Sequence, residues 1–292
     1  MDQPSTPPSS DDAKPASGGS LVRRGFWGLG DQAVVSGGNF LTNIILANAM
    51  PATEYGEYGL LWGVLLLLNG VHAAIVTYPL SVRGAGGSVE QIRRLAGGGV
   101  AITGCVGVVT VAMSLLACRA LAVENVAGWM ILAGLAWQLQ ETLRRALLAG
   151  FRMRAVIVGD AISYLGQAAG VAVLAYARQE TLPNVFAVLA GTSLLAAAVQ
   201  VVQVKLRLPR AGEFQEQVAH SWRIGRWSLL TNLIGIVNLQ AIPWVVTAFH
   251  GPASAAMLQA VNNVLGLTNP IVLGLHGIVT PSVAHARVGG LR

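Results

Sequence analysis

The chain has 292 residues, of which 53% are hydrophobic and only 11% are charged. An ordinary soluble domain carries roughly 25% charged residues, so this composition excludes a typical water-soluble globular protein. Basic residues number 19 against 13 acidic residues, which gives a net charge of +6. Such an excess is typical of nucleic-acid-binding proteins, unless the charges mark one side of a membrane.

The sequence predicts about eight membrane-spanning helices, because apolar stretches of roughly 20 residues recur between short basic or turn-rich segments. In chain order the predicted spans are 25–49, 57–80, 95–117, 126–143, 156–177, 184–204, 227–249 and 254–281. Residues 1–22 hold too few large apolar groups to fold and are predicted to be a disordered cytoplasmic tail. The predicted fold class is therefore an all-α, polytopic membrane protein.

The basic residues fall almost entirely on one side of these predicted spans. If the N-terminus is cytoplasmic, 17 of the 19 basic residues lie in the tail or near every second loop, and only Arg119 and Arg178 lie opposite. This asymmetry is what the positive-inside rule describes. It predicts a multi-pass protein of the cytoplasmic membrane with a cytoplasmic N-terminus, and it makes the lipid bilayer, rather than nucleic acid, the expected partner.

The stretch from Leu21 to Phe40, LVRRGFWGLGDQAVVSGGNF, allows three interpretations. Its paired arginines resemble a twin-arginine export signal, but the segment before the A-x-A pattern at residues 47–49 is too long and too polar for a cleavable signal. Residues 28–33 fit the loose pattern of a dinucleotide-binding loop, which needs a preceding strand that the sequence does not predict. The stretch is therefore predicted to be the first membrane helix.

Polar residues of the first span follow helical spacing and share one face of the helix. They are Gln32, Ser36, Asn39 and Asn43, with Asp31 beside them. A carboxylate at mid-membrane costs roughly 2.5–3.5 kcal/mol. This face is therefore expected to point into protein or into a water-filled cavity rather than into lipid.

Further polar stripes follow in later spans. They comprise Gln138, Glu141 and Arg145 beside Gln140 and Arg144; Asp160, Tyr164 and Gln167; Ser228, Asn232, Gly235 and Asn238; and Gln259, Asn262, Gly266 and Asn269. In the fourth span, Glu141 is expected to pair with Arg144 or Arg145 along the helix, and the alternative is a direct role in binding substrate or ion. Each stripe alone fits helix-to-helix contact, but together they favour a hydrated interior.

No Ser/His/Asp set, paired carboxylate site, metal-ligand spacing or phosphate-binding loop is recognisable in the sequence. The sequence therefore predicts no enzymatic activity, no cofactor and no metal site. Small residues at Gly59 and Gly63, and at Gly166 and Gly170, have the spacing that lets membrane helices approach closely.

An internal repeat relates the start of the chain to its end after a shift of 201 residues. The aligned pairs include Pro51 with Pro252, Ala52 with Ala253 and Asp31 with Asn232. Parallel repeats around an axis along the membrane normal are one layout that transporters use. The expected domains are a six-helix lobe at 23–210 and two helices of a second lobe at 211–292. The chain is then either a truncated product or one that completes its second lobe by oligomerising.

Two quoted runs resemble a known family. The run GFWGLGDQAVVSGGNFLTNIILANAMPATEYGEYGLLWGVLLLL, with its short turn and Tyr-Gly pair between Pro51 and Gly59, resembles the first two helices of the polysaccharide and lipopolysaccharide-unit flippases. The run QETLRRALLAGFRMRAVIVGDAISYLGQ is similar to their fourth and fifth helices. These flippases belong to the multidrug/oligosaccharidyl-lipid/polysaccharide exporter superfamily. The resemblance implies two lobes with about twelve to fourteen helices in all and transport by alternating access, so this chain holds only part of the second lobe.

The resemblance also implies a cargo, a lipid-linked oligosaccharide, that carries a pyrophosphate and many hydroxyl groups. For the anion the expected residues are Arg144 and Arg145, and for the sugars they are Asn39, Asn43 and Gln167. For a coupling proton or monovalent cation they are Asp31, Glu141 and Asp160. Association with polysaccharide assembly proteins is implied as well.

Two other functions compete with this interpretation. A cation-coupled multidrug antiporter of the same superfamily would use intramembrane carboxylates for its cargo or its coupling ion. A membrane accessory or scaffold lobe would perform no transport of its own.

Overall fold

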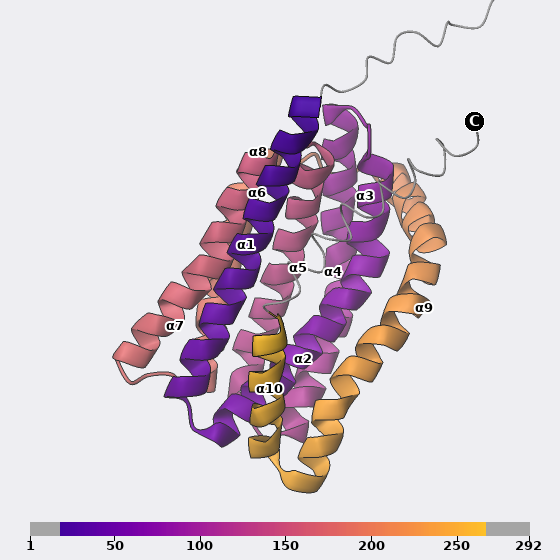
Figure 1. Cartoon of the computed structure of the whole chain (residues 1–292). Helices are drawn as coiled ribbons and strands as arrows, with labels where there is room; N and C mark the ends of the chain where they lie inside the picture. The colour runs from indigo at the N-terminus through magenta and orange to yellow at the C-terminus, as the bar shows by residue number, and fades with distance from the viewer. Residues whose placement is uncertain (1–17, 267–292) are drawn as a thin grey trace, which may run out of the picture.

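The computed structural model describes residues 18–266, which form a bundle of long helices (Figure 1). The helices are α1 (Gly18–Ala49), α2 (Ala52–His72), α3 (Tyr78–Gly84), α4 (Val89–Ala120), α5 (Ala127–Ala149), α6 (Met153–Asp160), α7 (Gly166–Tyr176), α8 (Leu182–Val204), α9 (Ala211–His250) and α10 (Pro252–Gly266). Two π-helical segments, η1 (Ala73–Thr77) and η3 (Ala161–Leu165), make α2 continuous with α3 and α6 continuous with α7. A single 3₁₀ turn, η2 (Glu124–Val126), precedes α5.

The described residues contain no strand, and five of their helical stretches are long and apolar enough to cross a membrane. These stretches are Ala52–Gly84, Val89–Ala120, Met153–Tyr176, Leu182–Val204 and Ala211–His250. Large apolar side chains such as Val108, Leu195 and Val202 point outward from the bundle, as contact with lipid requires. The protein is therefore an all-α, polytopic membrane protein, as predicted.

The two helices that carry most of the charged candidate residues, α1 and α5, lie inside the same bundle. They contain the predicted spans 25–49 and 126–143, and α5 packs between α4 and α8 at the centre of Figure 1. Because of their polar side chains, α1 and α5 are not among the five apolar stretches named above, although both helices pack beside those stretches. The predicted span 254–281 begins within α10 and continues outside the described residues.

Two helices begin before the boundaries that the sequence predicts. Helix α1 begins at Gly18, so residues 18–22 belong to a helix and not to the predicted tail. Helix α9 begins at Ala211, well before the predicted span at 227–249. Hydropathy detects the part of a helix that meets lipid, whereas the polar first turns of α9 pack on protein. Gln217, for example, donates from Nε2 to the Leu95 carbonyl at 2.8 Å.

The helix boundaries agree with the internal repeat. Helix α1 ends at Ala49 and α9 ends at His250, which is again a shift of 201 residues. Pro51 precedes the first residue of α2, and Pro252 is the first residue of α10. Helices α9 and α10 pack against α2, and α10 also contacts α1, so the repeated pair of helices closes one side of the bundle.

Candidate functional site

Arg144 on α5 is the centre of a buried ionic cluster that joins three helices. Its Nη2 donates to Asp31 Oδ2 on α1 and its Nε donates to Asp160 Oδ2 on α6, both at 2.6 Å. Its Nη1 donates to Glu141 Oε1, one turn earlier on α5, at 3.3 Å. Charge-assisted bonds are among the stronger hydrogen bonds in proteins, so Arg144 ties both α1 and α6 to α5.

Glu141 is shared between two arginines. It accepts a second bond, at 3.0 Å, from Arg145 Nη2, so the predicted pairing along α5 is confirmed for both arginines. The Arg145 side chain is 36% exposed and lies at the edge of the cluster, whereas the Asp160 side chain is fully buried. Three carboxylates and two guanidinium groups leave this ionic cluster with an excess of one negative charge.

One oxygen of each aspartate has no partner inside the protein. Asp31 Oδ1 and Asp160 Oδ1 are both buried and accept no hydrogen bond from the described residues. Because Nε and Nη2 share one edge of the Arg144 guanidinium, the carboxyl groups of Asp31 and Asp160 lie side by side along that edge. Buried acceptors without a donor are rare, so these two oxygens are the exceptional polar atoms of the ionic cluster.

A cavity of about 850 Å³ lies between α1, α2, α5, α9 and α10. All four residues of the polar stripe predicted for the first span line it, on the same helix as Asp31. Helices α9 and α10 add further amides, namely Gln240, Gln259, Asn262 and Asn263. None of its lining residues in the described part of the chain is charged, so the cavity offers polar but neutral hydrogen-bonding groups.

Hydrogen bonds between amides hold the walls of the cavity together. Gln259 of α10 donates from Nε2 to Asn43 Oδ1 of α1 at 3.0 Å, and Asn263 donates from Nδ2 to the Phe40 carbonyl at 3.4 Å. Asn43 in turn donates to the Asn39 carbonyl at 2.9 Å. A side-chain amide has two N–H donors and an oxygen with two lone pairs, so these groups retain capacity for a hydroxyl-rich ligand.

Two stacked tryptophans form the aromatic part of the cavity wall. The rings of Trp62 on α2 and Trp137 on α5 lie 5.1 Å apart with an interplanar angle of 18°. Trp137 Nε1 also donates to the Tyr164 hydroxyl at 3.3 Å. Tyr164 follows Asp160 by one helical turn, so this hydrogen bond ties the cavity wall to the helix that carries Asp160.

The connection passes through the π-helical segment η3, which follows Asp160 directly. Such segments occur mostly as single turns inside α-helices and are frequent at functional sites. Helix α1 approaches η3 closely at Gly38, where an added Cβ would lie 2.7 Å from the backbone of Tyr164. Glycine is required at this crossing, and the crossing brings the stripe of α1 next to the ionic cluster.

A second polar network joins α5 to α2 and α4, and of its members the sequence pattern marked only Gln138. Fully buried His72 lies with Nε2 at 3.0 Å from the hydroxyls of both Thr103 and Thr142. Gln138 exchanges hydrogen bonds with Thr110 on α4 at 2.9 and 3.1 Å. The partners of His72 are 31 and 70 residues away in the sequence, so no local pattern marks this histidine.

The structure separates the predicted site residues into groups. Asn39 and Asn43 line the cavity, while the two predicted arginines and the three predicted carboxylates form the ionic cluster. Gln167 belongs to neither group, since it is buried and donates to Ser163 Oγ of its own helix at 3.4 Å. Sequence reasoning missed Trp62 on α2, which belongs to no polar stripe, and Gln240 on α9, because the stripe chosen there does not line the cavity.

The stripe of the eighth span is only partly described. Gln259, Asn262 and Gly266 line the cavity, and Asn269 lies outside the described residues. No group of three His, Cys, Asp or Glu side chains within residues 18–266 is placed to hold a metal ion. Comparisons of the chain with protein-family models, with curated proteins and with solved structures find no match.

Proposed function

We propose that the chain belongs to a transporter that moves a lipid-linked oligosaccharide across the cytoplasmic membrane and is coupled to protons. One observation carries this proposal: an uncharged, amide-rich cavity of about 850 Å³ shares helices α1 and α5 with a buried ionic cluster that contains a pair of carboxyl groups. The proposed function requires only that the protein binds the cargo and moves it, and no covalent bond of the cargo is made or broken.

The lining of the cavity suits sugars. Amides donate to and accept from hydroxyl groups, and Trp62 and Trp137, whose rings stack on each other, add an apolar section to the cavity wall. All three kinds of guanidinium nitrogen of Arg144 are already bound to carboxylates. Arg145 is partly exposed and its Nε has no partner, so Arg145 is the better candidate for the pyrophosphate.

The pair of Asp31 and Asp160 is the proposed proton site. A proton bound between the two carboxyls would weaken the ion pairs of Arg144 with α1 and with α6. Helix α1 carries the polar stripe of the cavity on a neighbouring face, so a shift of α1 changes the cavity wall. Proton binding and cargo binding would then be linked, each altering the affinity for the other by the same factor.

The proposal is tested by flipping of a fluorescent, pyrophosphate-linked oligosaccharide lipid in proteoliposomes, read out with a membrane-impermeant quencher. We expect flipping that depends on the protein and accelerates with a proton gradient. Asp31→Asn should abolish the acceleration, because Asn cannot take up a proton. Glu124→Gln is the matched control, since Glu124 is exposed in the turn before α5, and it should behave as wild type.

Each alternative predicts a different result in the same vesicles. Export of a cationic dye without lipid flipping would favour the multidrug antiporter. If the vesicles show neither lipid flipping nor dye export, the result would support an accessory lobe and contradict the proposal. Flipping that ignores both the proton gradient and Asp31→Asn would contradict the assigned proton site while leaving the cargo assignment in place.

A further inference from the structure

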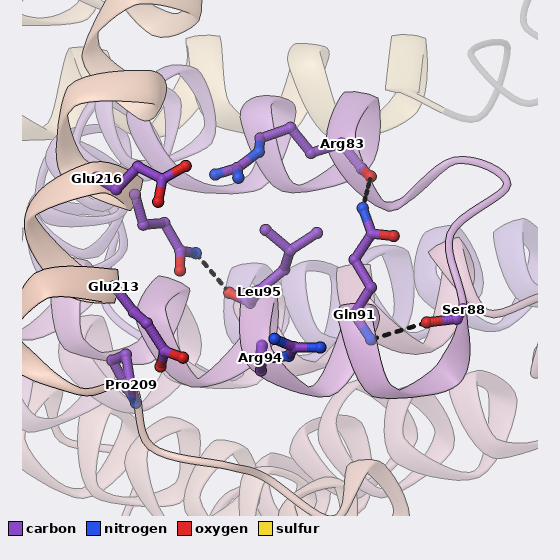
Figure 2. A pocket seen from close by; sticks show the side chains of 9 residues that line it. Arg83, Ser88, Gln91, Arg94, Leu95, Pro209, Glu213 and Glu216 are labelled. Carbon is purple, nitrogen blue, oxygen red and sulfur yellow. Dashed lines mark hydrogen bonds between the residues drawn. The ribbon is translucent and has the colours of Figure 1, made fainter.

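A second hollow, separate from the cavity described above, lies at the end of the bundle that holds the ends of α3 and the starts of α4 and α9 (Figure 2). Its volume is about 340 Å³, and none of its lining residues lines the larger cavity. Arg83 and Arg94 come from α3 and α4, and Glu213 and Glu216 come from α9. Opposite charges therefore face each other across a space, which we call the headgroup pocket.

These charges do not neutralise one another directly. No ion pair within 4.0 Å joins Arg83 or Arg94 to either glutamate among the described residues, and Arg83 Nη1 is buried without a hydrogen-bond partner. Figure 2 shows the Arg83 guanidinium directed toward the Glu216 carboxylate across the pocket. Buried donors are normally satisfied, so the wall that carries Arg83 has an unsatisfied donor, and Glu216, exposed to solvent, places negative charge opposite it.

A nearby ion pair shows how a closed contact looks in the same region. Arg207, in the segment between α8 and α9, donates to Glu90 at 2.7 Å. This hydrogen bond raises the pKa of the Arg207 guanidinium above its ordinary value. Oppositely charged side chains beside the headgroup pocket thus form a direct ion pair, whereas the arginines and glutamates that line the pocket do not.

Neutral hydrogen bonds keep the pocket open. Gln217 donates to the Leu95 carbonyl at 2.8 Å and fixes α9 against α4. Gln91 donates from Nε2 to the Arg83 carbonyl at 3.2 Å, and its backbone N–H donates to Ser88 Oγ at 3.2 Å. The distance between the two charged walls is therefore set by groups other than the charges, which is the property of a preformed binding site.

The headgroup pocket lies where lipid head groups are expected. Its basic residues belong to the side that the positive-inside rule assigns to the cytoplasm, and the apolar parts of α3 and α4 begin next to it. A purely anionic ligand would be repelled by Glu213 and Glu216, and a purely cationic one by the two arginines. A ligand that carries both charges satisfies both walls.

We propose that the headgroup pocket binds a zwitterion made of a phosphate and a primary ammonium, as in the head group of an aminophospholipid. The phosphate contacts Arg83 and Arg94, and the ammonium contacts Glu216 with Glu213 beside it. The same chemistry occurs in a bilayer lipid and in free phosphoethanolamine. The assignment is independent of the transported cargo, because the two hollows share no residue.

The test measures lipid retention by the purified chain with native mass spectrometry after release from nanodiscs. Separate nanodiscs contain phosphatidylethanolamine, phosphatidylcholine or phosphatidylglycerol. All three lipids carry a phosphate, but only phosphatidylethanolamine carries a primary ammonium, so the comparison distinguishes the contributions of the two groups. We expect preferential retention of phosphatidylethanolamine, reduced about tenfold by Arg83→Gln and by Glu216→Gln, which corresponds to about 1.4 kcal/mol. Arg93→Gln is the control, because Arg93 neighbours the pocket, does not line it and pairs with Glu90 at 3.9 Å.

A parallel titration with soluble phosphoethanolamine in detergent identifies the source of the ligand. If soluble phosphoethanolamine binds while no lipid is preferentially retained, and both pocket variants lose this binding, the site is assigned to a free zwitterion. The proposed chemistry of the pocket is then retained. Equal retention of all three lipids without soluble binding would overturn the proposal. Thermal unfolding of each variant shows whether it is folded, and exposed Glu216 provides a variant that removes charge without disturbing the bundle.

Discussion

The ionic cluster around Arg144 and the amide-lined cavity both lie inside the helix bundle, but their polar side chains differ in charge and in how fully they are hydrogen-bonded. The cluster is buried and charged, and its side chains pair with one another at distances of 2.6 to 3.3 Å, leaving one oxygen of each aspartate without a partner among the described residues. The cavity is open and neutral, and its amides hold only some of the hydrogen bonds that they can form. Inside one bundle, charge is confined where it holds helices together and neutral polarity is placed where a ligand can replace water.

This contrast implies different responses to mutation. A buried charge that loses its partner cannot be hydrated, so the penalty falls on the stability of the fold. An amide in an open cavity can be replaced at small cost to the fold, so the penalty falls on ligand binding. The following changes, ordered by expected size, separate the two kinds of site.

The largest effect is expected from Arg144→Met, which leaves three carboxylates around an apolar side chain. Breaking a buried ion pair from one side costs about 3–5 kcal/mol, and here three pairs are lost. Unfolding by heat in detergent should show a large drop in midpoint. Arg93→Gln, at an exposed pair, should change stability by less than about 1 kcal/mol. Equal effects of the two variants would mean that the cluster does not hold the helices together.

A smaller loss of stability and a large loss of binding are expected from Gly63→Leu. An added Cβ at this position would lie 2.6 Å from Gln240 Oε1 in the cavity wall. Overpacking costs about 1–3 kcal/mol, while the leucine occupies space that the cargo needs, so affinity for the oligosaccharide lipid should fall at least about tenfold. Gly104→Leu is the control, because nothing lies within 4 Å of a Cβ there. Unchanged affinity in Gly63→Leu would remove the cavity from the transport path.

An intermediate effect of about 1 kcal/mol on stability is expected from Trp137→Phe, which keeps an aromatic ring but removes the donor to Tyr164. If this hydrogen bond links the cavity to the cluster, the variant should bind cargo with less dependence on pH than wild type. Binding measured at several pH values, together with a double-mutant cycle with Tyr164→Phe, tests this link. Full pH dependence in both single variants would place the coupling elsewhere.

The smallest net effect is expected from combining Thr110→Val with Gln138→Met between α4 and α5. Either change alone leaves a buried polar group without its partner, at a cost of about 1–3 kcal/mol. The two changes together remove both groups and should restore stability to within about 1 kcal/mol of wild type. A double variant as unstable as the sum of the singles would show that these residues do more than join two helices.

The sequence predicted the arrangement of side chains wherever helical periodicity alone decides it. The stripe of α1 lines the cavity as expected because residues three and four apart share a helix face. Gly59 and Gly63 lie at close approaches of α2 to α10 and α9, and Gly166 and Gly170 at an approach of α7 to α8, as the small-residue spacing indicated.

Contacts between distant parts of the chain were not predictable in this way. Arg144 and Asp31 are 113 residues apart, and nothing local to either residue identifies its partner. The π-helical segments also have no sequence signal, since they arise where packing forces one extra residue into a helical turn. The stripe singled out on α9 does not line the cavity, whereas Gln240 does, because a helix that is polar on several sides does not indicate which side faces the interior.

The shared guanidinium edge of Asp31 and Asp160 has a consequence for energy conversion. The repeated hairpin carries an amide, Asn232, at the position equivalent to Asp31, so this pair of carboxyl groups occurs only once in the repeat. If the pair takes up one proton in each turnover of the proposed transport cycle, one elementary charge enters with it. At a membrane potential of 100 mV that charge supplies roughly 2.3 kcal/mol, which limits the concentration ratio of cargo that one turnover can sustain.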